Sequence, residues 1–454
     1  MTLETINPFT GEILEQFEEQ TPPQVEQLLE KAGRAFLTWR RTSFSDRARI
    51  LRKAADLLRR NAKEYAAVMA REMGKPLSQG QGESEKCAGV CEYYAEKAEE
   101  FLRPELIPTD ASKSIVRFEP LGTVLAIMPW NFPFWQVFRF AAPALMAGNV
   151  ALLKHASNVL RCALTIETLL REAGLPDGAF QSLILSNSRV EAVIRHPVVQ
   201  AVTLTGSTRA GQAVAAQAGA ALKKTVLELG GSDPYLILED ADLGQAVETC
   251  AYSRLINSGQ SCIAAKRFIV LEPVRKAFQE RLVEAMRNQP RGEPFEEGVT
   301  VGPLARPDLR DSLHKQVEKS IKMGALLHLG GKIPSIRGSF YPPTVLTDVR
   351  KGMPAYEEET FGPVAAVIPA RNDEEAVQIA NDSPFGLGAA VFTQDLRRGE
   401  EIATRLQAGC CFVNTFVKSD PRLPFGGIKQ SGYGRELSAF GIREFVNIKT
   451  IYVK

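Results

Sequence analysis

The sequence has few residues of the kinds that hold metals or covalent cross-links, and it has no marked excess of charge. Seven cysteines are spread over 454 residues in spacings that match neither a disulfide framework nor a zinc site. Four scattered histidines do not form a metal-binding cluster, so no metal is expected. The 55 basic residues nearly balance the 53 acidic ones, which excludes the basic character typical of proteins that bind nucleic acid or anionic membranes.

The sequence also lacks a recognisable leader and an uninterrupted membrane-spanning run. It begins Met-Thr-Leu-Glu-Thr, without the basic and apolar pattern of a secretory signal. The most apolar stretch, residues 124–146, is broken by Asn131, Arg139 and three prolines, so it is interpreted as a buried strand and helix. We therefore expect a cytoplasmic protein. Its length indicates about three lobes, because single cores rarely exceed ~250–300 residues.

The first hundred residues have the pattern of helices. Apolar residues recur at helical spacing after Thr21, an N-cap that two prolines follow. Ser45-Asp46 predicts the start of a second helix. A third is predicted to end at Gly74, a glycine C-cap with a proline shortly behind it.

From about residue 115, short β-branched or apolar runs alternate with helical segments. The expected strands cover residues 115–118, 124–128, 150–154, 183–185, 202–205 and 225–229. The expected helices between them cover residues 133–146, 159–173 and 208–221. This alternation predicts an α/β fold with a doubly wound parallel sheet. Such sheets bind ligands at the carboxyl ends of their strands, where Asn131, Lys154 and Gly206 fall.

A second α/β lobe is expected after Glu228. Its predicted strands cover residues 268–271, 364–369 and 389–393, and its predicted helices cover 274–287 and 373–380. Residues 424–432 form a glycine-rich loop, and residues 446–453 form a terminal strand that needs a sheet to join.

One cysteine stands apart from the others. Cys262 ends the small and polar segment Asn-Ser-Gly-Gln-Ser-Cys, where a nucleophile is expected rather than a packing atom. The remaining cysteines are interpreted as small core residues. Glu228 precedes Leu-Gly-Gly, and two glycines let a substrate or cofactor approach the backbone. The pair suggests covalent catalysis by Cys262 with Glu228 as base.

An anion site is predicted between a strand and a helix at residues 205–211. The usual Gly-x-Gly-x-x-Gly fingerprint is absent, and Thr-Gly-Ser-Thr-Arg-Ala-Gly stands in its place. A helix that begins near Thr208 directs free N–H groups outward, which suits a pyrophosphate, with Ser207 as a further donor. The alternative is a simple turn that Ser207 caps.

Other polar positions have both a functional and a structural interpretation. Lys154 could hold ribose hydroxyls or phosphate, or it could be a solvated strand end. Asn131 could donate to an oxyanion, or it could form an Asx turn. Glu359 could belong to a site or to a charged turn. A cysteine hydrolase would need a histidine partner, for which His155 is a weak candidate.

Taken together, these motifs resemble the aldehyde dehydrogenase superfamily in order and spacing, from Asn7 to the terminal strand. Residues 153–158 and 228–234, with Ser419-Asp420, look like the short bacterial succinate-semialdehyde dehydrogenases. The resemblance implies a Rossmann-type cofactor domain (1–102 and 120–230) and an α/β catalytic domain (231–432). It also implies a small β oligomerisation arm (103–119 and 433–454), and hence a homodimer or homotetramer.

The resemblance implies that Cys262 attacks an aldehyde, that Asn131 holds the oxyanion, and that Glu228 activates the water that hydrolyses the thioester. It assigns cofactor contacts to Trp130, Lys154, Ser157, Gly206, Ser207, Gly211, Leu229, Glu359 and Phe361. Relatives that prefer NAD often carry glutamate where this chain has Ser157, so we predict NADP as the cofactor, with NAD possible.

The same resemblance assigns the substrate contacts to Phe132, Trp135, Arg139, Ser261, Ser419 and Phe425. Arg139 follows Asn131 by about two helical turns and suits the distal carboxylate of a semialdehyde, although it could instead pair with a structural carboxylate. The predicted reaction is oxidation of succinic semialdehyde to succinate. The alternatives are another semialdehyde or small aliphatic aldehyde (for example glutaric semialdehyde), CoA acylation, a thiol hydrolase, or a catalytically idle cofactor-binding protein.

Overall fold

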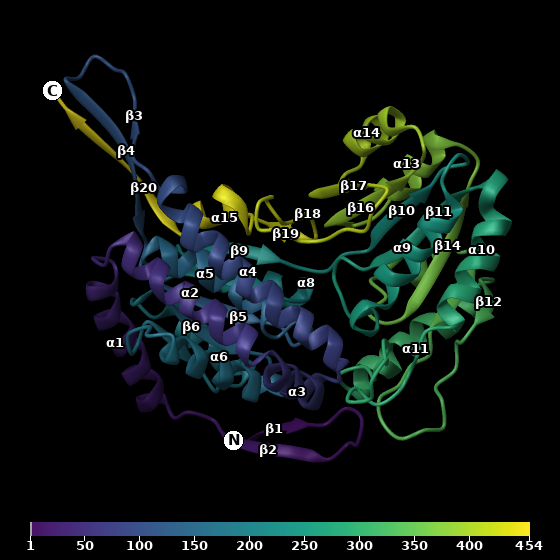
Figure 1. The fold of residues 1–454 in the computed structure, drawn as a ribbon, viewed down its shortest axis with the longest axis horizontal. Coiled ribbons are helices and arrows are strands. Elements are labelled where there is room, and N and C mark those ends of the chain that lie inside the picture. Colours follow the sequence, from purple (N-terminus) through teal and green to yellow (C-terminus); the bar gives the residue numbers. More distant parts are fainter. Residues whose placement is uncertain (1) are drawn as a thin grey trace.

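Two predominantly parallel sheets organise the chain in the computed structural model, which describes residues 2–454 (Figure 1). The first has six strands in the order β19-β9-β8-β5-β6-β7, and only the β19–β9 pair is antiparallel. Its strands are β5 (Thr123–Met128), β6 (Val150–His155), β7 (Phe180–Ser182), β8 (Val199–Thr205), β9 (Lys224–Glu228) and β19 (Gly432–Tyr433). Every residue of β6 is buried, as in a sheet that is covered on both faces.

Eight helices of the first 230 residues belong to this half of the molecule, and their apolar residues join one large core with the sheet. They are α1 (Pro22–Trp39), α2 (Phe44–Arg60), α3 (Ala62–Met73), α4 (Leu77–Phe101), α5 (Trp135–Ala147), α6 (Leu160–Glu172), α7 (Val190–Arg195) and α8 (Thr208–Ala220). Helix α4 packs against both α2 and α5, which places its inner face beside the segment that enters α5.

The second sheet has seven strands in the order β12-β13-β14-β11-β10-β16-β17, and only β12 and β13 are antiparallel neighbours. The strands are β10 (Asp233–Ile237), β11 (Ala265–Leu271), β12 (Leu326–Leu329), β13 (Thr344–Thr347), β14 (Val364–Ala370), β16 (Gly388–Phe392) and β17 (Cys410–Val413). Its helices are α9 (Leu243–Leu255), α10 (Glu272–Arg287), α11 (Pro307–Lys322), α12 (Pro354–Glu357), α13 (Asp373–Asn381) and α14 (Leu396–Arg405). Two separate apolar clusters lie on its two faces.

A three-stranded antiparallel sheet projects from the first lobe and carries the C-terminus (Figure 1). Its strands are β3 (Glu105–Leu106), β4 (Lys113–Pro120) and β20 (Val446–Val453), and β20 pairs with β4 along its whole length. The terminal strand predicted from the sequence therefore pairs with a sheet, as expected. None of the helices within residues 2–454 is long and apolar enough to cross a membrane.

The observed elements correct three details of the predicted secondary structure. The chain begins with a hairpin of β1 (Thr2–Ile6) and β2 (Ile13–Glu18) rather than with a helix. Helix α2 begins at Phe44, because the cap is Ser43, whose hydroxyl accepts from the Asp46 N–H. The strand predicted at residues 183–185 lies three residues earlier, at β7, so that the apolar run is the segment leaving the strand.

We keep the three-part domain division as a proposal, and the packing near the C-terminus bears on where its last boundary should lie. Strand β19 pairs with β9, and Leu437 and Ile442 belong to the core of the first lobe. Helix α15 (Ser438–Arg443) contacts α4 and α5. Residues 432–445 thus pack on the first lobe, and of the C-terminal segment 433–454 it is β20 that belongs to the projecting sheet.

Candidate active site

The polar residues predicted from strand ends are brought together at one edge of the first sheet. Strands β9, β8, β5 and β6 are neighbours and run parallel, so their carboxyl ends lie side by side. Glu228 ends β9, Gly206 follows β8, Asn131 follows β5, and Lys154 lies near the end of β6. This edge is where doubly wound sheets bind ligands.

The second sheet faces this edge with residues that precede its strands. Cys262 lies just before β11 and Glu359 just before β14. The Gly231 N–H donates to the Glu359 carboxylate over 3.0 Å. Buried Lys266 donates to the Cys262 carbonyl over 2.7 Å, and its Nζ lies 3.6 Å from the same carboxylate. These contacts fix the cysteine loop relative to Glu359.

The two glycines after Glu228 make room for protein groups. A Cβ at Gly230 would lie 2.6 Å from Glu359 Oε2, and a Cβ at Gly231 would lie 2.6 Å from the Cys262 carbonyl oxygen. The sequence interpretation had assigned this close approach to a substrate or cofactor. The structure instead shows that both glycines let the two halves of the site close against each other.

The turn that leads to Cys262 holds three consecutive residues in the left-handed region. Asn257 and Ser258 have φ of 53° and 56°, and Gly259 has φ of 76°. The two non-glycine residues are tied down: the Asn257 N–H donates to Gln79 Oε1, and the Ser258 hydroxyl donates to the Gly302 carbonyl. Such strain persists only where the surroundings determine it, as at a catalytic loop.

The thiol of Cys262 is half-buried and lines a cavity. Burial raises its pKa to about 12, while the cations of Arg139 and Lys266 oppose that rise. Because the thiolate is the nucleophile, a neighbouring base is needed to take the proton.

Glu228 has the properties of such a base. Burial raises its pKa well above the ordinary value, the nearby carboxylate of Glu436 adds to the shift, and Arg139 acts against it. Neither of its carboxylate oxygens has a hydrogen-bond partner among residues 2–454. The carboxylate lies against the loop that carries the cavity residue Phe425, because a Cβ at the adjacent Gly426 would stand 2.7 Å from Glu228 Oε1.

Asn131 is held by the cysteine loop. Its side-chain nitrogen donates to the Gln260 backbone carbonyl over 3.1 Å, and its backbone carbonyl accepts from Asn257 Nδ2 over 2.7 Å. The alternative of an Asx turn is not realised, since its Oδ1 accepts no hydrogen bond from residues 2–454. An amide nitrogen carries two hydrogens, so one remains for an oxyanion.

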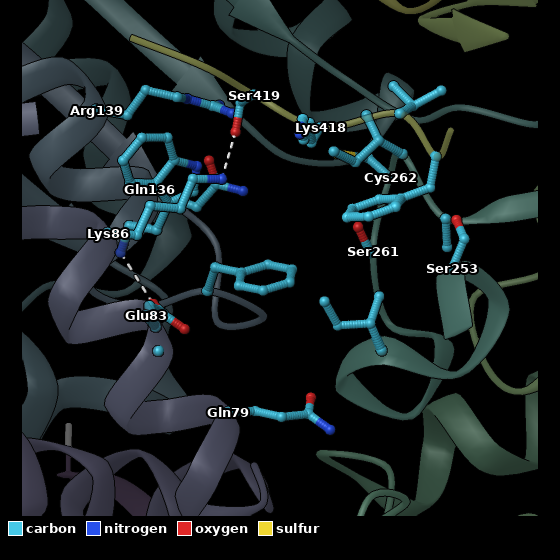
Figure 2. Close-up of a pocket in the computed structure, with 18 of the residues that line it drawn as sticks. Gln79, Glu83, Lys86, Gln136, Arg139, Ser253, Ser261, Cys262, Lys418 and Ser419 are labelled. Atoms are coloured by element: carbon cyan, nitrogen blue, oxygen red, sulfur yellow. Dashed lines mark hydrogen bonds between the residues drawn. The ribbon is translucent and has the colours of Figure 1, made fainter. Parts of the chain in front are cut away.

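A cavity of about 460 Å³ opens onto Cys262 (Figure 2). All six side chains predicted to contact the substrate line it together with the thiol: Phe132, Trp135, Arg139, Ser261, Ser419 and Phe425. Figure 2 shows Arg139 and Ser419 on one wall and Ser261 and Cys262 on the wall opposite. Aromatic rings and three cationic side chains, those of Lys86, Arg139 and Lys418, thus surround the approach to the nucleophile.

Arg139 takes part in both interpretations that the sequence left open. Its Nε forms an ion pair with Glu436, so it does pair with a carboxylate of the protein, and Nη2 donates to the Thr205 hydroxyl over 3.3 Å. The guanidinium also lines the cavity and lies 4.7 Å from the centre of the Phe425 ring.

The predicted cofactor residues lie around the start of α8 and the end of β6. Ser207 caps α8 by accepting from the Ala210 N–H over 3.3 Å, which is the structural alternative, although its hydroxyl proton is still free to donate. Gly211 leaves room for Leu229, which would lie 2.5 Å from a Cβ there. Lys154 donates to Asn187 Oδ1, and Ser157 is exposed at the start of η1 (Ser157–Val159).

Two further predicted cofactor residues meet across the lobes. The rings of Trp130 and Phe361 pack edge to face with centroids 5.8 Å apart. Glu359, two positions before Phe361, has a pKa raised by burial and opposed by Lys266.

His155 is not available as the partner of a thiol hydrolase. Both ring nitrogens engage backbone groups, at 3.2 Å from the Met128 carbonyl and 2.9 Å from the Pro133 carbonyl. Burial lowers its pKa to about 4, so it is a neutral residue that holds the strand end in place.

Several polar residues of the site were missed in the sequence. Lys86 lines the cavity from α4, Glu436 pairs with Arg139, and Lys266 holds the cysteine loop. The only signal for Lys86 is its helical spacing with Gln79 and Glu83, which is equally typical of a solvated helix face.

The chain was compared with known proteins. A family model described as "Aldehyde dehydrogenase family" matches residues 1–451. A "Probable succinate-semialdehyde dehydrogenase [NADP(+)]" of Synechocystis is 49% identical over the full length of both chains. A "Succinate semialdehyde dehydrogenase [NAD(P)+]" of Escherichia coli is 48% identical over 99% of this chain and 97% of that protein. The crystal structure of succinic semialdehyde dehydrogenase from Streptococcus pyogenes with NADP⁺ matches 99% of both chains, with a TM-score of 0.97 and 39% identity.

Proposed function

The chain belongs to the aldehyde dehydrogenase family, and from that premise we propose that it oxidises succinic semialdehyde to succinate with NADP as the preferred cofactor. One observation carries the proposal: the Cys262 thiol and the Arg139 guanidinium line the same cavity. A semialdehyde carries an electrophilic carbonyl at one end and a carboxylate at the other, which suits this pair. The names of the most similar relatives support the same substrate.

The first chemical step is attack of Cys262 on the aldehyde carbon. The thiol proton passes to Glu228, directly or through water, since this carboxylate lies against the loop that carries Phe425 and has unengaged oxygens. The S–C bond forms as the carbonyl π bond breaks, and the charge moves to oxygen. The free hydrogen of the Asn131 amide and the Cys262 N–H stabilise that oxyanion.

The nicotinamide ring, when bound, supplies the hydride acceptor that allows the thiohemiacetal to become a thioester. Glu228, which by then has passed the thiol proton on to solvent, takes a proton from the water that attacks the thioester carbon. The C–S bond breaks, the acid leaves, and the Cys262 sulfur recovers a proton. A carboxylate with a raised pKa is a stronger base than an ordinary one, which suits both proton transfers.

The residues at the end of β6 and the start of α8 fit a dinucleotide that carries a 2′-phosphate. Helix α8 directs its first-turn N–H groups toward the strand edge, which suits the pyrophosphate. Ser157 is neutral and exposed, and Lys154, the last but one residue of β6, adds a cation, so neither position repels a 2′-phosphate. Glu359 and Phe361 would hold the nicotinamide half.

We also propose that the chain works in the cytoplasm as a homodimer or homotetramer assembled through the projecting sheet. Large apolar side chains are exposed there, including Leu106 at 71%, Ile448 at 63% and Tyr452 at 50%. Exposed apolar residues on the edge strands of a sheet are typical of a surface that another subunit covers.

The test is reduced-cofactor formation by the purified protein with a set of aldehydes, with and without CoA, using NADP and NAD in turn. We expect fastest turnover of succinic semialdehyde with NADP, no requirement for CoA, and loss of turnover in Cys262→Ser. Faster turnover of glutaric semialdehyde would transfer the proposal to that substrate. A CoA requirement, or acid release without cofactor reduction, would reject the reaction type.

A further inference from the structure

Lys86 is a cation of the cavity wall that the mechanism above does not use. It lies on α4 and is half-buried. Its Nζ donates to the Ser419 hydroxyl over 2.7 Å and lies 4.1 Å from the centre of the Trp135 ring (Figure 2). Both of these neighbours, like Lys86 itself, line the cavity that opens onto Cys262.

No carboxylate within the described residues, 2–454, forms an ion pair with Lys86, and the two whose charges act on its pKa are already engaged. Glu83 accepts the N–H groups of Phe134 and Trp135 over 2.9 Å at Oε1, and pairs with Lys75 at Oε2. Asp420 pairs with Arg422 at 2.6 Å. The ammonium group therefore lines the cavity as a cation without an ion-pair partner among the residues that the structure describes.

Such a group is costly to keep charged. Burial, followed by repulsion from the Arg139 cation, lowers the Lys86 pKa to about 8. Glu83 and Asp420 oppose the shift only from a distance. An anion in the cavity would restore the charge balance, because the lysine would gain the partner that the protein does not supply.

Arg139 on its own has limited capacity to bind a carboxylate. Its Nε is paired with Glu436 and its Nη2 donates to Thr205, so two of its three nitrogens already have protein partners. Lys86 has three N–H donors and spends one on Ser419, which leaves two. The Ser419 hydroxyl accepts from Lys86, so its own proton is free to donate into the cavity.

We propose that Lys86 binds the distal carboxylate of the aldehyde substrate together with Ser419 and Arg139, and so determines specificity for an acid-bearing aldehyde. The inference rests on the proposed function, and it adds Lys86 as a second cation that binds the substrate carboxylate beside Arg139. An aldehyde without a carboxylate would leave Lys86 unpaired, so the lysine favours the semialdehyde and disfavours its uncharged analogue.

The test compares succinic semialdehyde with butanal, which has the same chain length and no charge, in wild type, Lys86→Gln, Lys86→Arg and Lys97→Gln. Lys97 lies on the same helix, is partly exposed, does not line the cavity and pairs with Glu100, so it is the matched control. We expect Lys86→Gln to raise KM for the semialdehyde about 10- to 100-fold with kcat nearly unchanged. Its kcat/KM for butanal should stay within about threefold of wild type, and Lys86→Arg should recover much of the loss.

Binding of succinate to the same proteins, measured by calorimetry, provides a second readout that does not depend on turnover. Lys86→Gln should weaken it by a similar factor, whereas Lys97→Gln should leave it unchanged. Equal losses for both aldehydes, or an unchanged KM and succinate affinity, would overturn the role of Lys86. If wild type itself shows no preference for the semialdehyde over butanal, then the proposed function fails as well, and the wild-type data alone reveal it.

Discussion

The two ends of the cavity differ in how their polar groups are satisfied. At the catalytic end (Cys262, Glu228 and Asn131), both oxygens of Glu228 have no partner among residues 2–454, and the Asn131 amide keeps one hydrogen beyond the one it donates to Gln260. At the cationic end (Lys86, Arg139 and Ser419), the groups are linked to one another or to Glu436 and Thr205. Groups left free can respond to charge that appears during a reaction, while groups held in place recognise charge that the substrate already has.

Substitutions at the two ends of the cavity should therefore change different kinetic constants. Changes at the catalytic end should lower kcat, because the interactions form only as the reaction proceeds. Changes at the cationic end should raise KM for a charged substrate. Arg139 connects the two ends, since its cation lowers the pKa values of Cys262, Glu228 and Glu436.

Glu228→Gln should have the largest effect. We expect kcat to fall about 10²- to 10⁴-fold with little change in KM, because the general base is lost and the shape is kept. In wild type the base must be deprotonated, and burial raises its pKa, so activity should fall as pH decreases through that raised value. The measurement is the pH profile of kcat from 5 to 9; a variant that retains the wild-type profile would refute the assignment.

Arg139→Ala should disturb both ends at once. We expect KM for succinic semialdehyde to rise about tenfold or more, with a smaller rise for butanal. Loss of the cation should also move the pH profile of kcat to higher pH, because the Glu228 pKa is no longer held down.

Stability provides the control for Arg139→Ala. Removal of the arginine leaves Glu436 buried and unpaired, which costs about 3–5 kcal/mol of unfolding free energy at neutral pH. Arg139→Lys should restore part of this stability. Equal KM changes for the charged and uncharged aldehydes would show that Arg139 is only a structural partner of Glu436.

Ser157→Glu should have the smallest effect on the chemistry, because it lies away from both ends of the cavity. We expect the ratio of kcat/KM for NADP to that for NAD to fall about tenfold or more, since a carboxylate repels a 2′-phosphate and can accept from ribose hydroxyls. Ser157→Ala is the matched control and should change the ratio only a few-fold. An unchanged kcat/KM for NADP in Ser157→Glu would contradict the role of Ser157 in cofactor preference.

The strand ends of the site could be predicted from the sequence because local patterns determine them. The apolar runs that end at Lys154, Thr205 and Glu228 mark parallel strands, and parallel neighbours place their last residues at one edge. The small and polar segment before Cys262 indicated a nucleophile, and the resemblance to known enzymes supplied the six substrate residues, which the structure brings together with the thiol.

The partners across the molecule could not be predicted in the same way. The Arg139–Glu436 and Lys86–Ser419 contacts join residues hundreds of positions apart, and no local pattern marks either pair. Gly230 and Gly231 are a further example. The sequence indicates that other groups can approach their backbone closely, but it does not indicate that these groups are Glu359 and the Cys262 carbonyl. Lys86 in particular looks like a surface residue until the fold places α4 beside the cavity.

The most direct test of the central claim, that the catalytic and cationic ends act on one substrate, is the ratio of kcat/KM for succinic semialdehyde to that for butanal, measured with NADP at neutral pH. The account predicts a ratio of about 10² or more for wild type, since two or three charge-assisted hydrogen bonds distinguish the substrates. A ratio near one for wild type would contradict it, because the cations beside Cys262 would then have no part in choosing the aldehyde.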